Sequence, residues 1–169
     1  SSPAPAAATK LVNPWADARE PVSGNPQAIG GYSAGCVQGA ESILANEGST
    51  FQVMRKSRRR YFAQPEMVHF IDKLASEIQR REFGTLLVGD LGQARGGPTT
   101  TGHASHQIGL DGDFWFWLDS PANHRKLTEQ EVEELSAISM LDQDRQGVDP
   151  KRFKAKHVSV LEYVSKQPE

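Results

Sequence analysis

Four residues that can bind a metal ion or carry a proton lie within eleven positions of the sequence: His103, His106, Asp111 and Asp113. Imidazole and carboxylate groups are typical ligands of zinc, and a catalytic zinc usually takes three protein ligands and leaves a position for water. A carboxylate beside an apolar segment is costly to desolvate unless a cation, a metal ion or good hydrogen bonds meet it. We therefore expect a metal site here, and the alternative is a solvated, histidine-rich turn.

The residues around this cluster predict a loop that leads into a strand. Three glycines and a proline between positions 96 and 102 disfavour a helix before the histidines. Residues 114–118 are bulky, apolar and rich in aromatic side chains, and a run of five is too short for a helix, so we expect a buried strand. Strand alternation then places Asp111 and Asp113 on one face.

The segment 105–113, SHQIGLDGD, resembles the first half of the zinc signature of the LAS family, which comprises the lysostaphin-type, D-Ala-D-Ala carboxypeptidase and related peptidases. In that family a histidine and an aspartate seven positions later bind zinc, and a later His-x-His element supplies the third ligand. The resemblance implies that His106 and Asp113 are zinc ligands. It also implies that His103 lies in the catalytic site, close enough to hydrogen-bond the attacking water or the tetrahedral intermediate.

Three further segments, 29–40, 51–62 and 84–97, are similar to the penicillin-insensitive murein endopeptidases, and the similarity extends over about residues 14–164. These are periplasmic zinc enzymes that cut peptide cross-links of peptidoglycan. The resemblance implies Zn²⁺ as the cofactor, the D-alanyl–diaminopimelyl cross-link as the substrate and the periplasm as the location.

Two features of the family have no counterpart in this sequence. No His-x-His element follows Asp113. In the family, the cysteine that Cys36 resembles forms a disulfide to the C-terminal region, whereas Cys36 is the single cysteine here. A free thiol packed as a small apolar residue is the alternative for Cys36. We therefore expect a peptidase domain that is incomplete at its C-terminal end.

Two more residues are candidates for substrate binding. Arg95 stands in a glycine-bearing loop after a predicted strand, where it is a candidate to hold a substrate carboxylate. The alternative is an ion pair of Asp90 with Arg95 that fixes the loop. Asp111 is a candidate to orient a metal ligand or a substrate amine, and the alternative is a hydrogen-bond acceptor behind the ligands without a part in the chemistry.

Composition adds limits of its own. A length of 169 residues fits one domain, and the net charge of −2 gives no reason to expect a nucleic-acid binder. The basic run at 55–60, RKSRRR, predicts either a solvated face or a patch that meets an anionic polymer. No apolar stretch approaches the roughly 20 residues of a membrane span. We expect residues 1–13 to form a disordered tail and residues 14–169 a single LAS-type domain.

The predicted elements give an α+β fold with an antiparallel core sheet flanked by helices, which is also what the LAS resemblance implies. Strands are expected at 51–54, 85–90 and 114–118, and helices at 65–81, 128–140 and 149–164. The three other histidines are expected on a helix surface (His69), in a polar loop (His124) and in the core (His157).

The sequence is also compatible with two alternatives to an active endopeptidase. A peptidoglycan-binding module would keep the fold and groove without a functional metal. A fragment of a longer enzyme would keep two zinc ligands and bind zinc poorly.

Overall fold

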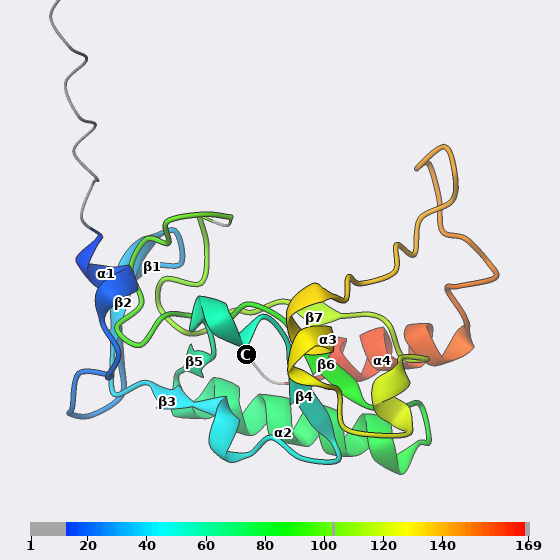
Figure 1. Cartoon of the computed structure of the whole chain (residues 1–169), viewed down its shortest axis with the longest axis horizontal. Helices are drawn as coiled ribbons and strands as arrows, with labels where there is room; N and C mark the ends of the chain where they lie inside the picture. Colours follow the sequence, from blue (N-terminus) through cyan, green and yellow to red (C-terminus); the bar gives the residue numbers. More distant parts are fainter. Residues whose placement is uncertain (1–12, 103, 168–169) are drawn as a thin grey trace, which may run out of the picture.

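A computed structural model of the chain describes residues 13–102 and 104–167 (Figure 1). The expected tail therefore lies outside the described residues except for Asn13, whose side chain caps the first helix. The helices are α1 (Pro14–Asp17), α2 (Pro65–Arg80), α3 (Glu129–Glu134) and α4 (Ala155–Ser165), with short 3-10 helices η1 (Ile43–Ala45), η2 (Lys56–Arg58) and η3 (Pro121–Asn123). The strands are β1 (Gln27–Gly31), β2 (Ala34–Gln38), β3 (Glu41–Ser42), β4 (Phe51–Val53), β5 (Phe62–Ala63), β6 (Leu86–Val88) and β7 (Phe114–Trp115).

The predicted α+β class is confirmed, and the central sheet has the strand order β4-β6-β7. The β6–β7 pair is antiparallel as expected, and so are the β1–β2 and β3–β5 pairs outside this sheet. The β4–β6 pair is parallel instead. The reason is the connection: α2 lies between these strands in the sequence, and a helical crossover returns the chain to the end of the sheet from which it started.

Alternating side chains of the central strands divide the core between two faces of the sheet. Leu86 and Val88 pack into a cluster with the buried face of α2, whereas Leu87 packs with Val132 of α3 on the other face. Period-2 alternation of this kind is what a strand covered on both faces requires. In Figure 1, α2 lies along one side of the sheet and α3 lies near its other side.

Helix α2 matches its predicted bounds within one residue, with Pro65 in its first turn. From the sequence, Gly84 is the glycine that would be expected to end this helix, but the helix ends before it. Glu82 takes the left-handed conformation (φ 57°), and the Phe83 N–H donates to the Ile78 carbonyl, which closes a Schellman motif before the glycine. Gly84 serves a different need, because a Cβ there would lie 2.2 Å from the Leu118 carbonyl oxygen.

Helix α3 begins as predicted and ends early. The capping box of Thr128 and Glu131 is present, but the helix ends at Glu134 and not near residue 140. Val132 is buried in the core, whereas Ile138 beyond the helix end is 42% exposed. A short helix in water depends on a packed apolar face, and the residues after Leu135 have none to extend it.

The last helix also starts later than predicted. Asp149 accepts backbone hydrogen bonds from Arg152 and Phe153, which forms an isolated turn, and α4 begins at Ala155. Val160 is buried, but Leu161 is 51% and Val164 38% exposed, so the apolar residues of this helix are only partly covered.

The remaining expectations concern single residues and membrane spans. Cys36 is a free, half-buried thiol of β2, and His69 and His124 are exposed as expected. Among the described residues, no helix combines the length and apolar character that a membrane crossing requires.

His157 is the predicted core histidine, and it joins α4 to the chain after β7. The side chain is 1% exposed and stacks on Phe153. Its Nδ1 accepts a hydrogen bond from the Lys154 N–H, and its Nε2 lies 3.1 Å from the Phe116 carbonyl oxygen. This pair of contacts fits the neutral ring with its proton on Nε2. Burial lowers the pKa of His157, and the neighbouring Lys156 acts in the same direction.

We predict that His157 makes the fold less stable in mild acid. Because its folded pKa lies below the unfolded value, the unfolded chain binds the extra proton first, and stability is lost as the pH falls through about 6.5. Urea unfolding at pH 8 and pH 5 should show a smaller pH dependence for His157→Gln than for the parent. His69→Gln, at the exposed histidine, should keep the parent's dependence. An unchanged dependence in His157→Gln would contradict the assignment.

Candidate functional site

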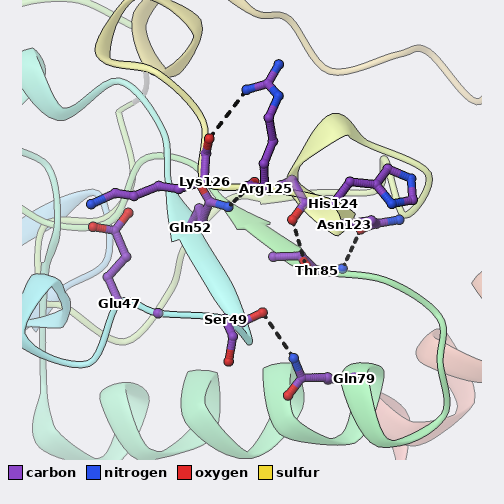
Figure 2. Close-up of a pocket in the computed structure, with 11 residues that line it drawn as sticks. Glu47, Ser49, Gln52, Gln79, Thr85, Asn123, His124, Arg125 and Lys126 are labelled. Atoms are coloured by element: carbon purple, nitrogen blue, oxygen red, sulfur yellow. Dashed lines mark hydrogen bonds between the residues drawn. The ribbon is translucent and has the colours of Figure 1, made fainter.

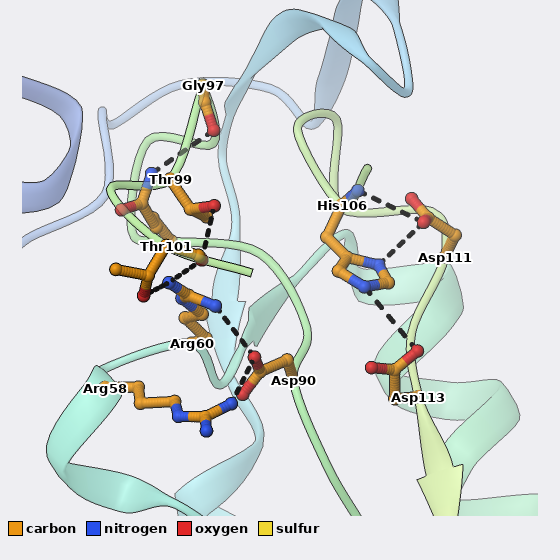
Figure 3. A network of polar contacts seen from close by, with 10 residues as sticks. Arg58, Arg60, Asp90, Gly97, Thr99, Thr101, His106, Asp111 and Asp113 are labelled. Carbon is orange, nitrogen blue, oxygen red and sulfur yellow. Dashed lines mark hydrogen bonds and ion pairs between the residues drawn. The ribbon is translucent and has the colours of Figure 1, made fainter. Parts of the chain in front are cut away.

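His106 lies between two carboxylates at the start of β7 (Figure 3). Its Nδ1 is 2.7 Å from Oδ2 of Asp111, and its Nε2 is 3.6 Å from Oδ1 of Asp113. The His106 side chain is only 5% exposed, while those of Asp111 and Asp113 are 35% and 41% exposed. The structure thus brings together three of the residues that the sequence singled out, with the open side of the cluster at the carboxylates.

The backbone of His106 is held in an unusual conformation. Its φ of 67° lies in the left-handed region, which costs a non-glycine residue about 1–2 kcal/mol. The Asp111 carboxylate accepts from the His106 backbone N–H at 3.1 Å, and the same oxygen lies 2.7 Å from Nδ1 of the ring. Hydrogen bonds to a charged group contribute about 1.5–3 kcal/mol each, enough to offset this strain. Strained backbone of this kind is concentrated at functional sites.

Gln107 anchors the same loop to the hairpin of β1 and β2. Its side-chain Nε2 donates to the carbonyls of Ser33 and Ala104, and its Oε1 accepts from the Gly35 N–H. Its backbone N–H donates to the Tyr32 carbonyl. Sequence reasoning missed this anchor, because a buried glutamine that replaces strand partners leaves no periodic signal.

Asp90 is a buried carboxylate that lies beside the His106 cluster (Figure 3). Its Oδ2 accepts from Nη1 of Arg58 at 2.9 Å and from Nη1 of Arg60 at 2.8 Å. Nη2 of Arg60 also donates to the carbonyl oxygen of Thr101 at 2.6 Å. The basic run is therefore not simply a solvent-exposed face, because two of its arginines form ion pairs with a buried carboxylate.

The two arginines contribute unequally. The side chains of Arg60 and Asp90 are 5% and 3% exposed, whereas that of Arg58 is 46% exposed. Removing one partner of a buried pair costs about 3–5 kcal/mol, since the other charge is left without compensation. An exposed pair is worth about 0–1 kcal/mol. Arg60 is therefore the structural partner of Asp90, and Arg58 adds the smaller share.

Backbone hydrogen bonds place Asp90 next to Asp113. The Gly89 N–H donates to the Asp113 carbonyl at 2.8 Å, and the Asp113 N–H donates to the Asp90 carbonyl at 2.9 Å. These bonds extend the β6–β7 pairing past the ends of both strands. The sheet itself thus sets the distance between the two charged groups.

Arg95, the other predicted substrate-binding residue, lies apart from this cluster. Its side chain is exposed and its Nε donates to the Glu20 carbonyl at 3.0 Å. The alternative of an Asp90–Arg95 pair is wrong, since the arginine partners of Asp90 are Arg58 and Arg60. His103 lies outside the described residues.

A cavity lies elsewhere, at the opposite end of the parallel strands (Figure 2). It has a volume of about 420 Å³ and is lined by residues that precede β4 and β6, among them Ser49 and Thr85. Its polar groups are used internally: Gln79 donates to the Ser49 carbonyl, and the Thr85 N–H donates to Asn123. Ligand sites in open sheets with parallel strands favour the carboxyl ends of those strands. Asp90 follows the carboxyl end of β6, with Asp113 beside it at the start of the antiparallel β7, so we place the candidate site there.

Within residues 13–102 and 104–167, no three His, Cys, Asp or Glu side chains are grouped so that they could hold a metal ion. The described part of the cluster offers two facing ligand atoms, His106 Nε2 and Asp113 Oδ1, with Asp111 on the far side of the ring.

Comparison with known proteins decides the family. The model of a family described as penicillin-insensitive murein endopeptidase matches residues 28–169. The chain belongs to this family. The matched residues include the candidate site and all three strands of the central sheet.

Curated relatives agree with this family. Penicillin-insensitive murein endopeptidases of Yersinia pestis, Yersinia enterocolitica and Pectobacterium atrosepticum are 36%, 40% and 36% identical to the chain. The alignments cover 90%, 81% and 88% of this chain and 54%, 48% and 51% of the relatives. The chain thus spans about half the length of the curated relatives it matches.

For this family member we predict that the loop carrying His106 cannot accept a side chain at Gly96. The φ there is +66°, and a Cβ would lie 1.9 Å from the Gln107 carbonyl oxygen. Overpacking combined with a left-handed backbone should cost Gly96→Ala about 1–3 kcal/mol in denaturant unfolding. Gly31→Ala is the matched control, because nothing lies within 4 Å of its Cβ position. Equal stability of the two variants would contradict the tight loop.

Proposed function

We propose that the chain forms part of a zinc-dependent endopeptidase that hydrolyses the D-alanyl–diaminopimelyl cross-links of peptidoglycan in the periplasm. Membership of the murein endopeptidase family supports the reaction class. The observation that carries the proposal is the His106 ring held by Asp111 at Nδ1 while Nε2 faces Asp113.

The geometry of these residues fits a zinc ion. Two ligand atoms at about 2.0–2.1 Å from a tetrahedral zinc are about 3.4 Å apart. The 3.6 Å between His106 Nε2 and Asp113 Oδ1 is close to this value. A histidine ligand generally donates its other ring N–H to a carboxylate, which fixes the tautomer and makes the ligand more basic. Asp111 stands in that position, 2.7 Å from Nδ1.

A bound zinc would polarise the scissile carbonyl and lower the pKa of a coordinated water towards neutrality. The chain's own residues prepare that role. The Asp111 carboxylate beside Nδ1 favours the tautomer that keeps its proton on Nδ1, so Nε2 presents a lone pair. Asp113 brings a negative charge to the same point from the adjacent strand end, on the half-exposed side where a substrate can approach.

We also propose roles for the other candidate residues, which are supported by fewer contacts in the structure. His103 is proposed as the helper that hydrogen-bonds the attacking water or the tetrahedral intermediate, as the family resemblance implies. Asp111 remains a candidate to orient a metal ligand or a substrate amine. Arg95 is a candidate for a substrate carboxylate only at a distance from the cluster, since its Nε is used by the Glu20 carbonyl.

We predict that zinc binds to His106 and Asp113. Metal analysis of the longest form of the protein after dialysis should show bound zinc in the parent and strongly reduced zinc in His106→Ala and Asp113→Ala. Asp111→Asn should bind zinc about 10–100-fold more weakly, the usual cost of losing the carboxylate behind a histidine ligand. His69→Ala is the matched control at an exposed histidine. Zinc content unchanged in both His106→Ala and Asp113→Ala would refute the ligand assignment.

A second prediction concerns turnover. Because a catalytic zinc usually takes three protein ligands, residues 1–169 alone should hydrolyse cross-linked muropeptides negligibly. A longer form of the protein that carries a His-x-His element should be active, and His103→Ala in that form should keep zinc while losing about 10²–10⁴-fold in rate. Comparable turnover by both forms would place the third ligand within this sequence. Binding of muropeptides without turnover by either form would favour a binding module.

A further inference from the structure

The loop that joins β6 to β7 is held by three sets of side-chain hydrogen bonds. Each set fixes a different stretch of the loop. Gln93 donates through Nε2 to the carbonyls at 96–98, which fixes the first stretch. Gln107 and Asp111 fix the last stretch around His106. The middle stretch, at Thr101, is held by Arg60.

The Arg60 guanidinium makes two different contacts with two different nitrogens. Nη1 donates to the Asp90 carboxylate at 2.8 Å, and Nη2 donates to the carbonyl and the hydroxyl oxygen of Thr101 at 2.6 and 3.2 Å. Among the described residues, these are the hydrogen bonds that join Thr101 to a distant part of the fold. A planar fork of donors can span two acceptors in this way, whereas a lysine ammonium is a point charge.

Arg60 itself stands on rigid backbone. The Leu91 N–H donates to the Arg60 carbonyl, and Phe62 and Gly92 exchange two backbone hydrogen bonds directly after it. The arginine therefore cannot follow the loop if the loop moves. The same holds for Asp90, whose carbonyl accepts from the N–H of Asp113.

We propose that Arg60 is a positioning residue, which clamps the Thr101 stretch of the histidine-bearing loop to Asp90 at the end of β6, the backbone neighbour of Asp113. The ion pair with Asp90 fixes the guanidinium, and the remaining donors fix the loop. The clamp follows from the contacts alone, and its importance for catalysis rests on the proposed function.

Hydrogen exchange of the 169-residue chain tests the clamp. Arg60→Lys retains a cation for Asp90 but cannot span both acceptors, so the hydrogen-bonded amides of Gly97 and Gln107, on either side of the clamped stretch, should exchange at least about tenfold faster while those of α2 keep their protection. Arg60→Met should loosen the same stretch and also lower the unfolding midpoint. Arg58→Gln is the matched control: it removes the exposed partner of Asp90 and should leave the loop amides as in the parent. Unchanged loop exchange in Arg60→Lys would overturn the clamp.

Kinetics of a longer, active form test the link to catalysis. A displacement of about 1 Å in a catalytic group can cost about 10²-fold, so Arg60→Lys should lower kcat by about that factor with little change in KM. A kcat equal to that of the parent, with loosened loop amides, would overturn the catalytic role of the clamp. Absence of endopeptidase activity in the longer parent form would instead overturn the proposed function, and the exchange result would still decide whether Arg60 holds the loop.

Discussion

The antiparallel backbone pairing at the ends of β6 and β7 is the constraint on which the site depends. Two hydrogen bonds, between Gly89 and Asp113 and between Asp113 and Asp90, fix two carboxylate-bearing residues side by side. Gly89 is tightly enclosed, since a Cβ there would lie 2.9 Å from the Trp115 ring nitrogen and 3.2 Å from the Asp113 Cβ. The two carboxylates are then treated differently: Asp90 is buried against arginines, and Asp113 stays half exposed beside His106.

The different surroundings of Asp90 and Asp113 give the first carboxylate a structural role and leave the second as the candidate for metal binding. A buried carboxylate with guanidinium partners is neutralised by the protein and has little to offer a ligand. A half-exposed carboxylate 3.6 Å from an imidazole nitrogen retains negative charge that a cation can meet. The cavity of about 420 Å³, by contrast, lies at the other end of the strands, where Gln79 and Asn123 form hydrogen bonds with neighbouring backbone.

The sequence predicted the parts of this arrangement that depend on local pattern. The positions of the three central strands, helix α2, the start of α3 and the convergence of His106 with Asp111 and Asp113 follow from periodicity, caps and short spacing. The third strand is shorter than expected, since β7 ends at Trp115 and not at residue 118. The family resemblance was also correct. The length of α3 was not predictable, because it ends where tertiary packing ends and the sequence continues with residues that a helix tolerates.

Contacts between distant parts of the chain were beyond local pattern. The parallel β4–β6 pairing depends on where α2 delivers the chain, and the role of Arg60 depends on three segments that meet only in the fold. From the sequence, the basic run at 55–60 was expected on the surface, because a run of charged residues does not indicate which of its side chains will be buried. The carboxylate that neutralises them, Asp90, stands thirty positions after Arg60.

The central claim is that Asp111 and Asp113 hold His106 so that Nε2 and the Asp113 carboxylate face one metal ion. The most direct test is a crystal structure of a zinc-loaded form, with the metal located by its anomalous signal. We predict zinc within about 2.2 Å of His106 Nε2 and of an Asp113 oxygen, with Asp111 still bonded to Nδ1. Zinc bound through Nδ1 of His106, or at a place without Asp113, would contradict the account.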